Sequence, residues 1–218
     1  MTTPIAPLLI KGGLAQVDPD NGQVLQLISF QFNPETVSRT LQVQRVESGD
    51  SNRAEALRLR GPAVETLTLE VEFDNADQME FPDENADAAE LGLHPQLAAL
   101  EMLIHPSSAK LQANEELAKS GTLEIAPMLA PLLLLIWGKQ RILPVNLTEF
   151  SITEEAFDPN LNPIRAKVSL GLRVLSIYDM PFDSYAGSVF MTYLGQKEQL
   201  ATKVLGATLG TFGIGGLP

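Results

Sequence analysis

The chain has 218 residues with 15 basic and 27 acidic side chains, and therefore a formal net charge of −12. This length suits one large domain or two small ones, and 44% apolar residues supply a core, which argues against a wholly disordered chain. The acidic excess argues against nucleic acid or an anionic membrane as the main partner, because both attract clustered Lys and Arg. The absence of cysteine excludes disulfides, thiolate metal sites and cysteine nucleophiles.

The N-terminus shows no basic region followed by an apolar stretch, so the sequence predicts no secretory signal and folding that begins in the bacterial cytoplasm. The most apolar stretch, residues 125–138, contains Pro127 and Pro131. It is shorter than the roughly 20 residues that a membrane span needs. We expect a buried strand there and no membrane insertion.

The first third of the chain predicts β structure. A strand over residues 7–17 is followed by a turn over 18–22, DPDNG, and by a strand over 24–32, so these form a hairpin. Alternation with polar residues predicts that one face of the second strand is buried; its members are Ile28, Phe30 and Phe32. The acidic turn resembles calcium-binding loops, but no EF-hand spacing follows, and we interpret it as a plain turn.

This second strand is predicted to end at Asn33-Pro34, because proline removes a hydrogen-bond donor and holds the preceding residue extended. Residues 35–46 are β-prone, and residues 45–60 predict a loop. Residues 65–73, ETLTLEVEF, alternate strictly, which predicts a strand with one buried face. The buried face comprises Leu67, Leu69, Val71 and Phe73.

An acidic insertion follows at residues 74–90 and contains no basic residue. Its acidic members are Asp74, Asp77, Glu80, Asp83, Glu84, Asp87 and Glu90. One hypothesis is a solvated loop, and the other is a docking patch for a basic partner. A helical segment is predicted over residues 95–119, as one helix at 95–104 and a second at 108–119.

A long hairpin is the main prediction for residues 122–178. The apolar run 132–137 is typical of a strand covered on both faces. Residues 145–153 and 164–174 are expected to be strands joined by a turn at 157–163. The second strand alternates strictly, with Ala166, Val168, Leu170, Leu172 and Val174 on its apolar face.

Residues 181–218 form an apolar, glycine-rich tail, which we separate from a β domain at 1–180. A helix is expected within 188–209, and a phosphate-binding loop is not supported by the glycines at 210–216. A terminus this apolar is usually held by packing. We expect it to dock on a neighbouring subunit, with Phe190, Tyr193, Leu205 and Phe212 as candidate contacts.

No group of residues assembles a catalytic or metal site in this reading. His94 and His105 each precede proline and match no ligand or triad spacing. Glu154 and Glu155 are adjacent in a strand and should point to opposite faces. We therefore expect no enzyme activity, cofactor or metal.

Three stretches carry a family resemblance. Residues 29–42, SFQFNPETVSRTLQ, contain Phe32-Asn33-Pro34; residues 132–138, LLLLIWG, end in Trp137-Gly138. Residues 147–175 then present Phe157-Asp158 and a strand that begins PIRAKV, with Pro163, Arg165 and Ala166. In this order they resemble the tube–baseplate adaptor of phage-tail-like contractile injection systems, a family often described by its LysM domain.

The resemblance, which covers about residues 5–180, implies a mainly β (α+β) fold, a tail-tube-like β-barrel or sandwich with a long β-hairpin and one or two helices. It implies a hexameric ring that connects the inner tube or its initiator to the baseplate and sheath, in a particle that stays in the cytoplasm or is released. No LysM module is recognisable after Asp179, so peptidoglycan binding is not expected. The alternatives are an inner tube protomer and a free-standing acidic module that binds a basic protein or a cation.

Overall fold

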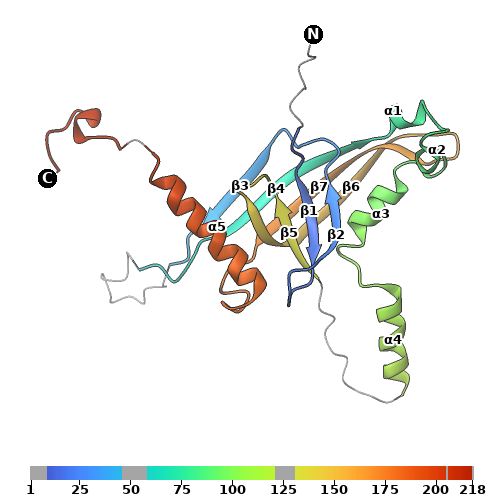
Figure 1. Ribbon diagram of the computed structural model, residues 1–218, viewed down its shortest axis with the longest axis horizontal. Helices are drawn as coiled ribbons and strands as arrows, with labels where there is room; N and C mark the ends of the chain where they lie inside the picture. Colours follow the sequence, from blue (N-terminus) through green and yellow to red (C-terminus); the bar gives the residue numbers. More distant parts are fainter. Residues whose placement is uncertain (1–8, 46–57, 121–130, 205, 218) are drawn as a thin grey trace, which may run out of the picture.

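The computed structural model describes residues 9–45, 58–120, 131–204 and 206–217 (Figure 1). Its centre is one seven-stranded antiparallel sheet in the order β2-β1-β5-β6-β7-β4-β3. The strands are β1 (Gly13–Val17), β2 (Val24–Ser29), β3 (Val37–Gln42), β4 (Val64–Asp74), β5 (Leu132–Ile136), β6 (Ile142–Phe157) and β7 (Pro163–Val174). The helices are α1 (Ala76–Met79), α2 (Ala86–Leu91), α3 (His94–Glu101), α4 (Ser108–Lys119), α5 (Tyr185–Ala201) and the 3₁₀ turn η2 (Leu209–Phe212). The predicted α+β, mainly β fold class is confirmed.

The strands β1 and β2 form the predicted hairpin. The turn is held by Asp18, whose Oδ1 accepts hydrogen bonds from the backbone N–H groups of Asp20 and Asn21. The second strand is shorter than predicted, because it ends at Ser29 rather than at residue 32. The alternation therefore stops early: Phe30 is fully buried, but Phe32 is 51% exposed, which corrects its predicted burial.

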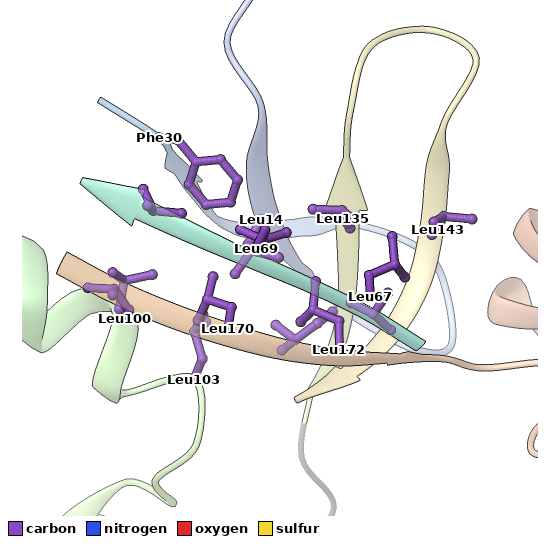
Figure 2. Close-up of a cluster of buried hydrophobic side chains, with 14 of the residues drawn as sticks. Leu14, Phe30, Leu67, Leu69, Leu100, Leu103, Leu135, Leu143, Leu170 and Leu172 are labelled. Atoms are coloured by element: carbon purple, nitrogen blue, oxygen red, sulfur yellow. The ribbon is translucent and has the colours of Figure 1, made fainter. Parts of the chain in front are cut away.

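The main hydrophobic core lies between the two halves of the curled sheet. Figure 2 shows β4 and β7 crossing over β1 and β5, with leucines of both halves pointing into the same space. The predicted alternation of β4 is confirmed, since Leu67, Leu69, Val71 and Phe73 are all buried. Helix α3 adds Leu97 and Leu100 to the same core.

The strand β5 is covered on both faces, as its continuous apolar run predicted. Leu133 and Leu135 point into the main core. Leu132 and Leu134 belong to a second cluster, which Ala186 of α5 completes on the other face. Both faces of β5 are therefore apolar, as a strand covered on both sides requires.

The strands β6 and β7 form the long predicted hairpin and pair from Val145–Val174 to Phe157–Pro163. Five residues of β7 face the core: Ala166, Val168, Leu170, Leu172 and Val174. A β-bulge in β6 lies between Leu147 and Glu149. Glu149 packs over Gly171, where a Cβ would lie only 2.8 Å from the Glu149 Cβ.

The two edges of the sheet are β2 and β3. Three apolar residues of β2, Val24, Leu25 and Leu27, are more than half exposed. Gln31, two residues after the end of β2, bridges to β4. Its Oε1 accepts a hydrogen bond from the Asp74 N–H at 2.9 Å, and its Nε2 donates one to the Asp74 carbonyl at 2.6 Å. A side-chain amide thus supplies two bonds of the kind that a paired strand would make.

The helical parts correct several expectations. The acidic insertion contains the short helices α1 and α2, where we expected a loop, and α3 begins at His94 and ends at Glu101. Helix α4 has the predicted bounds. Most of the predicted loop at 45–60 lies outside the described residues; Arg45 at its start pairs with Leu59 in an isolated antiparallel bridge.

Candidate functional site

The Phe-Asn-Pro and Trp-Gly motifs of the resemblance meet at one end of β1 and β5. Asn33 Oδ1 accepts a hydrogen bond from the Gly12 N–H at 2.8 Å, and Asn33 Nδ2 donates to the Ile10 carbonyl at 2.9 Å. The indole of Trp137 lies directly over Gly12, where a Cβ would meet its ring carbons at 2.6 Å. Phe30 and Trp137 make a tilted ring contact at 6.5 Å. We call this group of residues the clasp, because it fixes the chain as it enters β1.

The glycine of the Trp-Gly motif permits the turn between β5 and β6. Gly138 has φ +74°, a left-handed conformation that favours glycine. The turn is closed by the Trp137 N–H, which donates to the Arg141 carbonyl at 2.8 Å. Pro34 is half-buried next to Asn33 and leads toward β3. The structure therefore brings Asn33, Trp137 and Gly138 together but leaves Phe32 exposed.

The tip of the long hairpin is held by Asp158. Its Oδ1 accepts from the N–H groups of Asn160 and Asn162, and its Oδ2 accepts from Asn162 Nδ2. Burial alone would raise the pKa of Asp158, but these donated hydrogen bonds outweigh it and lower the pKa below its usual value. Phe157 at the tip is half exposed.

The hairpin tip also anchors the acidic insertion. The Leu93 N–H donates to the Pro163 carbonyl at 2.9 Å, and Asn162 Nδ2 donates to the Glu90 carbonyl at 3.0 Å. Gly92 packs against the same strand in a glycine-only conformation with φ +57°. These contacts place the start of α3 on the tip, so the hairpin and the insertion form one surface.

Of the predicted acidic docking residues, Asp74 differs from the others. It is the last residue of β4 and pairs with Arg165, whose Nη2 lies 2.7 Å from Asp74 Oδ2. The hydrogen bond from the Ala76 N–H and the charge of Arg165 together lower the pKa of Asp74 despite partial burial. The remaining candidates are exposed: Asp77, Glu80, Asp83, Glu84 and Asp87. The family-motif residue Ala166 is fully buried and belongs to the hydrophobic core.

The prediction that residues 181–218 form a docking tail is corrected in part. Phe190 and Tyr193 are only 6% and 4% exposed, because α5 packs them against the sheet of their own chain. They are therefore core residues and not docking contacts. Leu205 lies outside the described residues, and Phe212 is 69% exposed.

A buried ionic cluster was not predicted from the sequence. Glu65 of β4 is 4% exposed, and its carboxylate contacts Arg39 of β3 at 2.6 Å and Lys197 of α5 at 3.0 Å. Arg39 also donates to the Tyr193 hydroxyl, and the Lys197 ammonium lies 4.1 Å from the Tyr193 ring centre. Burial would raise the pKa of Glu65, but the hydrogen bonds and charges of both cations lower it. The cluster ties the edge strand β3 to α5.

The described part of the chain contains neither a candidate metal centre nor a membrane-spanning helix. Across residues 9–45, 58–120, 131–204 and 206–217, no three His, Asp or Glu residues are placed to hold a metal ion. Within the same part of the chain, no helix is long and apolar enough to cross a membrane. What the described surface offers instead is two sheet edges, exposed apolar side chains and ordered tips. These features are typical of a protein that assembles with others.

The fold and surface thus define a mainly β assembly protein. The family of contractile injection system tube proteins matches residues 14–176, which is most of the chain. The chain belongs to this family and is a structural component of a phage-tail-like contractile injection system. No curated protein matches it.

Two solved structures show limited similarity. A chain of the virion of a native gene transfer agent particle is 11% identical with a TM-score of 0.27; the match covers 76% of this chain and 91% of that one. A chain of the tail of an empty gene transfer agent particle is 16% identical with a TM-score of 0.26; here the match covers 74% and 90%.

Proposed function

We propose that this chain is the ring-forming adaptor that connects the inner tube, or its initiator, to the baseplate and sheath. Membership of the tube family supports self-assembly into a ring, in which neighbouring copies make heterologous contacts that close by rotation. The resemblance of the ordered motifs to the adaptor family points to the adaptor position in particular. We propose that the assembly forms in the bacterial cytoplasm and performs no catalysis.

The observation that carries the adaptor role is helix α4. It has twelve residues and none of them is buried, and it projects away from the sheet (Figure 1). Leu111 and Leu117 are each 50% exposed. Isolated helices of about 12–15 residues or fewer are marginal in water, so a free α4 needs a partner. A tube protomer stacks on copies of itself, whereas an adaptor needs a further surface for a different protein.

The exposed acidic side chains of α1 and α2 support the same role. Asp77 and Asp87 lie in their first turns, and the insertion that contains them is held against the hairpin tip. A patch of one charge sign steers a partner of opposite charge and fixes its orientation more than it adds affinity. We propose a basic surface of the baseplate or sheath as that partner.

Copy number tests the proposal. Particles purified from the native host through a tag on this chain would be imaged by electron microscopy, and each subunit would be quantified by mass spectrometry. An adaptor is expected at one ring per particle, far below the sheath and tube subunits. A copy number equal to that of the sheath would identify the alternative, the inner tube protomer, and a soluble monomer without particles would contradict both.

The role of α4 is tested separately by the double substitution Leu111→Glu and Leu117→Glu. Incorporation into particles is expected to fall strongly, because two charges would replace the exposed apolar contacts. The control Gln112→Glu places one charge on the same helix at an exposed position and should incorporate normally. Normal incorporation of the double variant would contradict α4 as the contact surface.

A further inference from the structure

The C-terminal segment contains a small turn that is ordered by its own hydrogen bonds. Residues Thr208 to Ile214, which we call the terminal turn, surround η2. At its start, Thr208 and Thr211 form a capping box. At its end, Gly213 has φ +69° and the Ile214 N–H donates to the Leu209 carbonyl at 3.2 Å, which is a Schellman motif. Both ends are thus capped within the turn itself.

This ordered turn displays apolar side chains to solvent. Phe212 is 69% exposed, and Leu209 and Ile214 are 40% and 43% exposed. No residue between 206 and 217 carries a charge, although the whole chain has a net charge of −12. The segment also lies beyond residues 14–176, so the tube family match does not include it. A preorganised apolar surface loses little entropy on binding and is well suited to docking.

An apolar groove of about 650 Å³ lies between the β1–β2 hairpin and the connection from α3 to α4. Its volume falls within the range of about 300–1,000 Å³ that is typical of binding pockets. The described lining residues include Gln26, Met102, Ile104, His105, Pro106 and Lys110, and none of those described is acidic. Met102 and Ile104 are 47% and 44% exposed.

We propose that the terminal turn of one copy packs into this groove of the next copy in the ring, with Phe212 as the anchor. The terminal turn lies beyond the end of α5, away from the β1–β2 hairpin and the α3–α4 connection that flank the groove, so the contact joins two copies (Figure 1). The match to a tube-protein family favours a second copy as the occupant, because a tube is built from copies of one chain. An uncharged turn that meets a groove lined without carboxylates adds no local repulsion between two chains of net charge −12. The contact is heterologous, as ring closure requires.

This inference rests on the proposed ring. A tube protomer is held by the rings above and below it, whereas an adaptor ring meets copies of itself only in its own plane. An additional contact between neighbours would therefore stabilise a ring that has no identical ring stacked on both sides. The terminal turn provides such a contact through side chains, without adding a strand to either edge of the sheet.

Cross-linking in purified particles tests the contact, because the chain has no cysteine of its own. The double variant Gly215→Cys and Gln26→Cys keeps Phe212, and a Cβ at Gly215 meets no atom within 4 Å. Disulfides form only when the two Cα atoms approach to about 4–7 Å. Mild oxidation is expected to shift the monomer band into a ladder of covalent oligomers on a non-reducing gel.

Two controls define the result. The double variant Gly215→Cys and Leu161→Cys carries its second thiol at the exposed hairpin tip and should stay monomeric. Adding Phe212→Ser to the first variant should abolish the ladder. A first variant that stays monomeric, or a ladder equal to that of the control, would overturn the inference. Copy number is measured in the same particles, so a ladder at high copy would refute the adaptor role while supporting the contact.

Discussion

The substitution Glu65→Gln tests the buried ionic cluster. Glutamine keeps the shape of the side chain but removes the charge that Arg39 and Lys197 contact at 2.6 and 3.0 Å. Hydrogen bonds to a charged group contribute about 1.5–3 kcal/mol each, and a buried pair that loses one partner costs about 3–5 kcal/mol. Because the Arg39 and Lys197 side chains are 28% and 35% exposed, water can solvate them after the change. We therefore expect a loss of about 2–3 kcal/mol in the free energy of unfolding.

The effect should depend on pH in a defined direction. The pKa of Glu65 is lowered in the folded chain, so the folded state favours the ionised carboxylate. Its stabilisation is complete above the unfolded pKa, about 4.3, and is lost as pH falls through the lower folded pKa. The stability difference between the wild-type chain and Glu65→Gln should therefore be largest at neutral pH and shrink below about pH 4.

Urea unfolding followed by the fluorescence of the single tryptophan measures this difference. The matched control is Glu70→Gln, on the exposed face of the same strand, which should change stability by less than about 0.5 kcal/mol. A Glu65→Gln effect as small as that of the control, or one that grows as the pH falls, would refute the argument for the cluster.

Three further changes follow from individual contacts. Asn33→Ala should cost about 1–2 kcal/mol and speed hydrogen exchange at the Gly12 amide, and unchanged exchange would contradict the clasp. Gly92→Ala should cost about 2–4 kcal/mol by urea unfolding, because its φ of +57° is strained for alanine and its Cβ would lie 2.6 Å from the Pro163 carbonyl oxygen; a neutral result would contradict that packing. Gly195→Ala in α5 meets no atom and should raise stability by about 0.5–1 kcal/mol in the same assay; a loss would contradict the open space there.

The strands of the core could be predicted because their patterns report burial directly. Leu67 to Phe73 alternate as one covered face requires, and Leu132 to Leu135 are apolar without interruption because α5 covers the second face. Helix α4 has the predicted bounds 108–119, and the structure adds that Ser107 caps it by accepting a hydrogen bond from the Lys110 N–H. Phe32 was misplaced because alternation predicts a face only as far as the strand extends, and β2 ends at Ser29.

The cluster at Glu65 shows what the sequence conceals. Glu65 lies two residues before Leu67 in β4 and therefore points to the same face of the strand, and that was the one available sign of its burial. Its compensating cations come from β3 and from α5, far away along the chain, so only the tertiary structure explains why the charge is tolerated. Tyr193 was assigned to a docking surface for the same reason, since nothing local indicates that α5 lies on the sheet.

The register of the β6–β7 hairpin has a mechanical consequence. Its hydrogen bonds run across two long antiparallel strands, from Val145–Val174 to Phe157–Pro163. A force along the strands loads all of these bonds at once, in shear, whereas a force across the open end would break them one after another. A component of a machine that contracts must bear sudden load. This hairpin resists such a load when it is pulled along its length and yields most easily when its open end is pulled apart.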